Sequence, residues 1–194
     1  TQRPDGRDIF QEMQAQGYRV ARSWEKAGAL PSGKTLVVAA PGNLPPPSKR
    51  GDVFRQAAVK ALDTLSRNPN GFFLMIEGSN IDKAAHSNNL EEMMEELLDF
   101  DRTAGAVLDW ASKHPGTLVV ITADHNTGAF ALTGGSREQG EITGRFGSGS
   151  HDGVAVPVYA FGAGSGDFTG IYENTDIFNK IMNAFKKGAD KPVR

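Results

Sequence analysis

Apolar residues follow two patterns along the chain, and each pattern predicts a different kind of element. Helical spacing with turn residues behind it predicts helices over 8–17, 52–71, 90–116 and 174–187. Short apolar runs bounded by turn residues predict extended segments over 18–23, 34–40, 71–78, 117–125 and 154–162. Strands separated by helices favour an α/β class, with a layered α/β/α fold and a largely parallel sheet.

The burial expected of these elements follows from the same patterns. The runs 71–78 and 117–125 are continuously apolar, so we expect buried strands there. The helix within 90–116 carries an apolar stripe that includes Met93, Met94, Leu97 and Leu98. Its acidic first half is expected to face solvent, where the helix dipole favours negative charge.

The segment 41–52, PGNLPPPSKRGD, is the only strongly proline-rich stretch of the chain. Three consecutive prolines disfavour both a helix and a central strand, so we expect a surface loop. Neither flank carries enough apolar pattern to fold by itself. We therefore expect a single domain over 1–194 with this loop on its surface.

Composition narrows the class of protein. The 194 residues are 39% hydrophobic and carry a formal net charge of -2, so a sizeable core is possible. The charges, 21 Lys and Arg against 23 Asp and Glu, form no long single-sign block, which argues against binding to nucleic acid or a membrane surface. No apolar run approaches the roughly 20 residues of a membrane span. With no cysteine, any metal would need His, Asp or Glu ligands.

Candidate ligands of this kind lie where two buried strands end. Glu77 ends the first strand, and Asp124 and His125 end the second. In open α/β folds, functional sites gather just beyond the carboxyl ends of strands. Between them, Asp82 and His86 are four residues apart, which places both side chains on one face if the segment is helical.

A third histidine completes a possible ligand set. His151 lies in a Gly/Ser-rich loop before the next strand, so Asp82, His86 and His151 would give the three ligands typical of a catalytic zinc. Asp124 and His125 supply only two ligands, and the single carboxylate of Glu77 would suit a hydrated magnesium.

Simpler interpretations stand beside this one. The pair Asp82 and His86 could be a helix-surface pair, Asp124 a cap of the next element, and Glu77 a buried acid bonded to backbone donors. His114 fits a helix carboxyl end without any ligand role. Ser148 and Ser150 are interpreted as loop residues, because their segment lacks the strained turn of a nucleophilic serine.

At these residues the sequence resembles the alkaline phosphatase family, over nearly the whole chain. The resemblance rests on the segments FFLMIEGSNIDKAAH, DRTAGAVLDWA, TLVVITADHNTGAFAL and GSGSHDGVAVPVYAFG. It implies that Asp82, His86 and His151 hold a first zinc, that Asp124 and His125 contribute to a second zinc, and that Glu77 binds magnesium. It also implies that Lys83 helps to bind the substrate phosphate, as in some bacterial members.

The resemblance implies an activity for which this chain supplies only some of the residues. No segment resembles the family's serine nucleophile, the aspartate shared by the second zinc and the magnesium, or the phosphate-binding arginine, so no catalytic nucleophile is expected in this chain. We expect the carboxyl-terminal portion of a phosphatase that hydrolyses phosphate monoesters through a phosphoserine intermediate. In such an enzyme, two zinc ions about 4 Å apart bind the attacking and leaving oxygens.

Two alternatives remain at this stage. The first is another enzyme of the same superfamily, a phosphodiesterase, sulfatase or phosphomutase. The nucleophile region distinguishes these enzymes from one another, and no segment of this sequence resembles it. The second is a non-catalytic module that binds metal or a partner. By family resemblance, the location is periplasmic or extracellular, and many members are homodimers.

Overall fold

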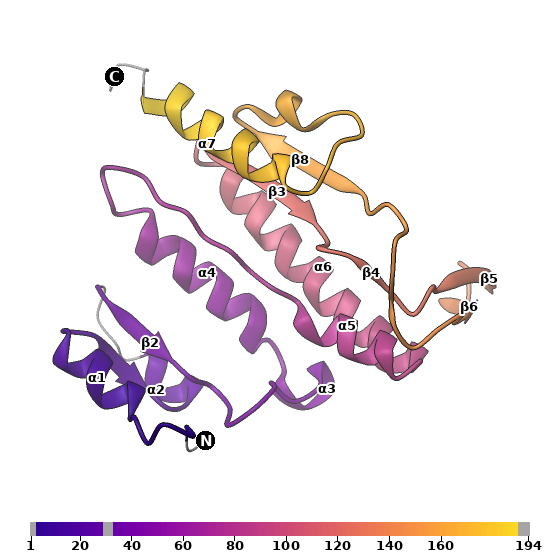
Figure 1. Cartoon of the computed structure of the whole chain (residues 1–194), viewed down its shortest axis with the longest axis horizontal. Helices are drawn as coiled ribbons and strands as arrows, with labels where there is room; N and C mark the ends of the chain where they lie inside the picture. Colours follow the sequence, from indigo (N-terminus) through magenta and orange to yellow (C-terminus); the bar gives the residue numbers. More distant parts are fainter. Residues whose placement is uncertain (1–2, 29–32, 190–194) are drawn as a thin grey trace. The chain divides into compact units, whose positions relative to one another are not determined.

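The computed structural model describes residues 3–28 and 33–189. The chain divides into two compact units, Thr1–Glu77 and Gly78–Arg194, which are described separately below. Both units mix helices with short strands, as an α/β class requires. The elements of each unit can be followed along the colour gradient of Figure 1.

The first unit alternates helices and strands as the sequence predicts. Its elements are α1 (Ile9–Ala15), β1 (Arg19–Ala21), α2 (Trp24–Gly28), β2 (Thr35–Val37), α3 (Pro47–Arg50) and α4 (Val53–Leu65). The strands β1 and β2 are parallel, with Val20 opposite Leu36. The side chain of Asp8 caps α1 by accepting hydrogen bonds from the N–H groups of Phe10 and Gln11.

The proline-rich segment 41–52 is mostly exposed, as expected of a surface loop, but it contains a helical turn. The turn α3 begins at Pro47, the third of the consecutive prolines. The expectation of no helix there was wrong, because proline is well tolerated at the first position of a helix, where its missing N–H would have no intrahelical partner.

The segment 71–78 differs from its prediction. No strand is assigned over these described residues, and exposed and half-buried positions alternate along them. Phe73 and Met75 are 61% and 76% exposed. The fully buried strand predicted here is therefore wrong for this structure, since an extended segment without a strand paired to it keeps one face in solvent.

The second unit begins with two helices, α5 (Ser79–His86) and α6 (Leu90–Ser112), that pack against each other. The side chain of Asn89 caps α6 by accepting a hydrogen bond from the N–H of Glu92. Ala84, Ala85 and Met93 form a buried cluster between the helices. The partly buried side chains packed against this cluster are Ile81, Leu90, Phe130 and Phe146.

The acidic half of α6 is not the solvated face that the sequence predicts. Glu96 and Asp99 are 4% and 1% exposed, whereas Leu97 and Leu98 are 43% and 50% exposed. Buried carboxylates are tolerated when they are hydrogen-bonded. Here Asn80 of α5 donates to Glu96, and Arg102 forms an ion pair with Asp99.

The strands of the second unit are β3 (Leu118–Thr122), β4 (Asn126–Thr127), β5 (Ala131–Ser136), β6 (Glu141–Arg145), β7 (His151–Asp152) and β8 (Val158–Gly162). A 3₁₀ turn η1 (Ser165–Phe168) and the helix α7 (Asp176–Ala189) follow. In Figure 1, β3 and β8 lie side by side beside α6, and the β5–β6 hairpin lies at the far end of this unit. No helix within 3–28 or 33–189 combines the length and the hydrophobicity needed to cross a lipid bilayer.

The strand pairing differs from the largely parallel sheet expected. Within the described residues, β1–β2 is parallel, and β3–β8, β4–β7 and β5–β6 are antiparallel. The reason is the connection between β3 and β8. That connection runs out through β4 and β5 and returns through β6 and β7, so it brings the chain back antiparallel without a crossover helix.

Candidate metal centre

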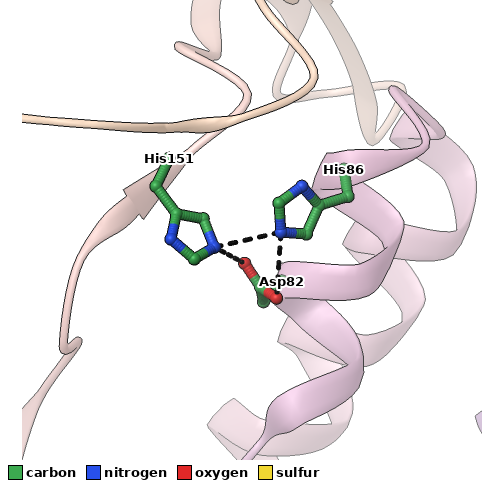
Figure 2. Close-up of side chains that lie close together, drawn as sticks. All are labelled: Asp82, His86 and His151. Carbon is green, nitrogen blue, oxygen red and sulfur yellow. Dashed lines mark hydrogen bonds and ion pairs between the residues drawn. The ribbon is translucent and has the colours of Figure 1, made fainter.

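Three side chains predicted to be metal ligands converge on one point. The Nε2 atoms of His86 and His151 are 3.0 Å apart. Nε2 of His86 lies 3.5 Å from Oδ2 of Asp82, and Nε2 of His151 lies 3.5 Å from Oδ1 of the same carboxylate. Figure 2 shows the three side chains pointing toward one another, two from α5 and one from β7. Asp82, His86 and His151 together could hold a metal ion.

The helix α5 places two of these ligands by its periodicity. Asp82 and His86 are one helical turn apart and share a face. The intervening residues Ala84 and Ala85 are buried against α6, so this packing fixes the orientation of the helix. The third ligand begins β7, where His151 is paired with Thr127 of β4.

The spacing of the ligand atoms fits a tetrahedral zinc ion. Zinc binds imidazole nitrogen and carboxylate oxygen at about 2.0–2.2 Å, so two such ligands at a tetrahedral angle lie about 3.3 Å apart. The two Nε2 atoms are 3.0 Å apart, and each lies 3.5 Å from a different oxygen of the Asp82 carboxylate, which are separations close to that value. The donor types also fit, since zinc accepts nitrogen and oxygen ligands and the chain has no cysteine.

The tautomer of His86 is set by a backbone carbonyl. Nδ1 of His86 lies 2.8 Å from the carbonyl oxygen of Gly149, which can only accept a hydrogen bond. Nδ1 therefore carries the proton, and Nε2 presents its lone pair toward Asp82 and His151. Metal-binding histidines commonly donate their second ring N–H to a carbonyl or carboxylate in this way.

Gly149 is the residue that allows this contact. A Cβ atom at position 149 would lie 3.2 Å from the carbonyl oxygen of His86, which is tighter than ordinary van der Waals contact. The Gly/Ser-rich loop 147–150 therefore brings its backbone close to the end of α5. The hydroxyls of Ser148 and Ser150 take no part in the centre, and Ser148 instead donates to the carbonyl of Ser150 within the loop.

Thr127 connects the ligand Asp82 with His125. Its hydroxyl donates to Oδ1 of Asp82 at 2.6 Å, because a carboxylate oxygen only accepts. Its oxygen also lies 3.1 Å from Nδ1 of His125 and can accept the proton of that nitrogen. The tautomer of His125 is thereby set with Nε2 free of its proton, and one buried hydroxyl links both predicted ligand groups.

The second predicted pair adjoins the first group. Nε2 of His125 lies 3.3 Å from Oδ2 of Asp124, the same separation expected of two ligands on one zinc ion. The ring of His125 stacks on the ring of His151 at 3.6 Å between centroids. The side chain of Asp124 is 88% exposed, so its carboxylate is accessible to an ion. These two residues still supply only two ligands.

The remaining predicted residues occupy different positions. Lys83 follows Asp82 on α5, is exposed, and donates to the side-chain oxygen of Asn80 at 3.5 Å. Glu77 is exposed and is the last residue of the first unit, and it is not among the three grouped ligands. His114 fits its simpler interpretation: Nδ1 donates to the carbonyl of Trp110 at 2.7 Å, and the two rings stack.

Three residues near the ligands were not singled out from the sequence: Thr127, Gly149 and Asp152. Thr127 and Gly149 set the histidine tautomers, and Asp152 follows His151 directly. The only available signal was their closeness in sequence to predicted ligands. Their contacts with Asp82, His86 and Asn126 span 45, 63 and 26 positions, so no periodic pattern could have revealed those contacts.

Fold and geometry together define the class: an α/β protein that gathers histidines and carboxylates, in metal-ligand geometry, at the ends of its strands and helices. The alkaline phosphatase family model matches residues 1–144. The chain therefore belongs to the alkaline phosphatase family, as its resemblance implied.

Curated relatives agree with this assignment. The chain is 30% identical to streptomycin-6-phosphate phosphatase of Streptomyces griseus over 92% of its own length and 51% of that protein. It is 29% identical to alkaline phosphatase 4 of Bacillus subtilis strain 168 over 69% of its own length and 44% of that protein. The chain thus spans about half the length of the curated relatives it matches.

Solved structures show the same fold. Alkaline phosphatase from the Antarctic bacterium TAB5 superimposes with a TM-score of 0.80 and 32% identity, covering 95% of this chain and 56% of that one. A mutant of TAB5 alkaline phosphatase with Mg bound superimposes with a TM-score of 0.83 and 32% identity, covering 95% and 57%. The predicted alkaline-phosphatase-like α/β fold, present in part, is confirmed.

Proposed function

We propose that this chain is the metal-binding portion of a zinc- and magnesium-dependent phosphatase that hydrolyses phosphate monoesters. The observation that carries the proposal is the convergence of Asp82, His86 and His151 with the ligand separations of a tetrahedral zinc site. Family membership supplies the reaction class. We further propose that both units belong to one incomplete domain, 1–194.

Each predicted ligand has a role in this proposal. Asp82, His86 and His151 hold the first zinc, Asp124 and His125 contribute to the second, and Glu77 binds the magnesium. Bound zinc supplies Lewis-acid stabilisation of phosphoryl oxygens and lowers the pKa of a bound water toward about 7.

The side chains of this chain orient and bind the substrate. Lys83 is an exposed ammonium one residue from Asp82, so its positive charge can contact a phosphate bound beside the first group of ligands. The serine nucleophile that forms the phosphoserine intermediate comes from a part of the protein outside this sequence. This chain alone is therefore expected to be inactive.

Relatives favour phosphate monoesters over the other substrates of the superfamily. Streptomycin-6-phosphate phosphatase and the alkaline phosphatases of Bacillus subtilis and Escherichia coli are all phosphatases by name. None of these three is a sulfatase or phosphomutase. Following the bacterial relatives, we propose a periplasmic or extracellular location.

A calorimetric zinc titration of the metal-stripped chain tests the proposal. We expect tight binding of one zinc ion, and His151→Ala should abolish it because two ligands rarely hold zinc tightly. His114→Ala is the matched control, since His114 bonds to the carbonyl of Trp110 at the end of α6 and its replacement should leave zinc binding unchanged.

Hydrolysis of an aryl phosphate by the same preparations tests the proposal that the chain alone is inactive. The zinc-loaded chain should hydrolyse it no faster than zinc in buffer. Enzyme-like turnover would contradict the proposal that the nucleophile lies elsewhere. Equal zinc affinity in the wild type and His151→Ala would contradict the assigned ligand set.

A further inference from the structure

Asp152 is held by four hydrogen bonds beside the metal ligands. Nδ2 of Asn126 donates to both of its carboxylate oxygens, at 3.1 Å to Oδ1 and 2.9 Å to Oδ2. The backbone N–H of Val154 donates to Oδ1 at 3.1 Å, and the backbone N–H of Ala129 donates to Oδ2 at 3.1 Å. Three of the four bonds come from the chain that follows His125, and the fourth comes from beyond His151.

These bonds exclude a ligand role for Asp152 itself. An ionised carboxylate offers about four acceptor positions, and each oxygen of Asp152 already accepts two hydrogen bonds. An ion bound there would have to displace backbone donors. Charge-assisted bonds to N–H groups are among the stronger hydrogen bonds, so the carboxylate is better suited to holding backbone than to binding metal.

The position of Asp152 determines what it holds. In the β4–β7 ladder, Asn126 is paired with Asp152, and the next pair is Thr127 with His151. The ladder is two residues long on each strand, and backbone bonds of Gly128 to the loop 147–150 continue it, among them one from the N–H of Gly128 to the carbonyl of Ser150 at 3.0 Å. In a pairing this short, the side-chain bonds of Asp152 contribute to the register as well. A slip of one residue would turn His151 to the other face of the strand.

One carboxylate therefore joins the two segments that carry ligands. Asn126 is adjacent to His125, and Asp152 is adjacent to His151. Their side-chain bonds keep Thr127 opposite His151, where Thr127 reaches Asp82 and the rings of His125 and His151 stack at 3.6 Å.

We propose that Asp152 is a positioning residue of the metal centre, which, with Asn126, fixes the β4–β7 register that aims His151 at Asp82 and His86. The inference rests on the proposed metal-binding function of those three residues. Asp152 does not contact the ion or the substrate. It acts through the orientation of the His151 ring.

The variant Asp152→Asn tests this with little change of volume. The new amide would point an N–H at donors that now face a carboxylate oxygen, so at least one of the four bonds is lost. Asn126→Ala is the second variant: it removes the two side-chain bonds and leaves the two backbone bonds to Asp152. Asp109→Asn, at an exposed position on α6, is the matched control.

Cobalt titration of the 194-residue chain gives the first readout. Co²⁺ uses the same nitrogen and oxygen ligands as Zn²⁺, and its visible absorption reports the number and geometry of its ligands. We expect Asp152→Asn to weaken Co²⁺ binding about 10- to 100-fold and to alter the visible bands. Asn126→Ala should do the same to a smaller extent, and Asp109→Asn should match the wild type.

The imidazole proton signals of the metal-free chain give the second readout, because stacking of His125 on His151 shifts them. We expect these signals to move in Asp152→Asn and in Asn126→Ala but not in Asp109→Asn. Should Asp152→Asn fail to fold, Asn126→Ala decides. Unchanged signals and unchanged Co²⁺ spectra in a folded variant would overturn the positioning role. If the imidazole signals shift in the variants but the wild-type chain binds no metal, Asp152 still orients His151, and the proposed metal-binding function is refuted.

Discussion

At the scale of single residues, the centre depends on groups that set histidine tautomers as much as on the ligands. Gly149 accepts from Nδ1 of His86, and Thr127 accepts from Nδ1 of His125. In each case the other ring nitrogen is left free to bind a metal. A ligand set taken from sequence spacing alone omits these hydrogen-bond acceptors.

Thr127→Val tests the role of the hydroxyl with almost no change of shape. The variant removes the hydrogen bond to Asp82 and the acceptor for His125. We expect zinc affinity to fall about 10- to 100-fold, as measured by competition with a chromophoric chelator. Thr133→Val, at an exposed position on β5, is the control and should bind zinc as the wild type does. Full zinc affinity in Thr127→Val would refute the role of Thr127.

Gly128→Ala tests the packing beneath the centre. Gly128 has a φ of +80°, and a Cβ atom there would lie 2.8 Å from the ring of Phe146 and 3.1 Å from the carbonyl oxygen of Ala85. We expect the free energy of unfolding to fall by roughly 1–3 kcal/mol, as measured by denaturant titration.

Gly105→Ala is the comparison for Gly128→Ala, because position 105 has space for a Cβ atom. Gly105 lies within α6, and a Cβ atom there meets nothing within 4 Å. Alanine has the higher helix propensity, so this variant should be stabilised by about 0.5–1 kcal/mol. Equal effects of the two substitutions would contradict the steric argument at Gly128.

At the scale of elements, the helix α7 is joined to the turn η1 by charge. Nζ of Lys187 donates to Oδ2 of Asp167 at 2.6 Å, and Nζ of Lys180 donates to the carbonyl of Asp167 at 2.7 Å. The hydrogen bond from Lys187 lowers the pKa of Asp167 below its ordinary value. An electrostatic pairing of this kind holds α7 against η1.

The effect on stability has a definite sign. The pKa of Asp167 is lower in the folded chain than in the unfolded chain, so the pair stabilises the fold above the ordinary aspartate pKa. That stabilisation is lost as the pH falls through the lowered pKa. We expect Lys187→Gln to raise the pKa of Asp167 toward its ordinary value, measured by carbon NMR of the carboxyl group. The control Lys186→Gln should not, and equal pKa values in all three proteins would contradict the assigned cause.

The same scale shows why some elements were predictable and others were not. The helices α1, α4, α6 and α7 follow directly from apolar spacing, and β3 and β8 from apolar runs. The ladders β4–β7 and β5–β6 have no such pattern, because their short strands are polar or glycine-rich and are held by partners distant in sequence. The predicted exposure of Glu96 and Asp99 was wrong for a related reason. Both carboxylates are buried with partners, Asn80 and Arg102, that the charge pattern of the sequence does not reveal.

The predicted ligands divide in the same way. Asp82 and His86 were predictable as a pair because a helix fixes the spacing of residues four apart. The approach of His151 depends on a loop and a two-residue ladder, so spacing could only suggest it. Thr127, Gly149 and Asp152 act through hydrogen bonds that leave no local pattern in the sequence.

At the scale of the whole molecule, the chain exposes large apolar side chains on α7 and β8. On α7, Phe178, Met182 and Phe185 are 67%, 40% and 45% exposed and share one helical face. On β8, Tyr159 and Phe161 are 64% and 44% exposed. A chain that spans about half of its relatives would expose surfaces of this kind.

This exposure predicts self-association of the isolated chain. Sedimentation velocity should show a sedimentation coefficient that rises with concentration. The double variant Phe178→Ser, Phe185→Ser should reduce that rise because it removes apolar area from α7. The control Asn179→Ser, Asn183→Ser changes exposed polar positions of the same helix and should not. A monomer at all concentrations in the wild type would contradict the prediction.

The central claim is that Asp82, His86 and His151 bind one zinc ion together. X-ray absorption at the zinc edge of the chain loaded with one equivalent of zinc tests it most directly. We expect two imidazole nitrogens and at least one oxygen at about 2.0–2.2 Å, with one imidazole lost in His151→Ala. Zinc surrounded by oxygen alone, or an unchanged imidazole count in His151→Ala, would contradict the claim.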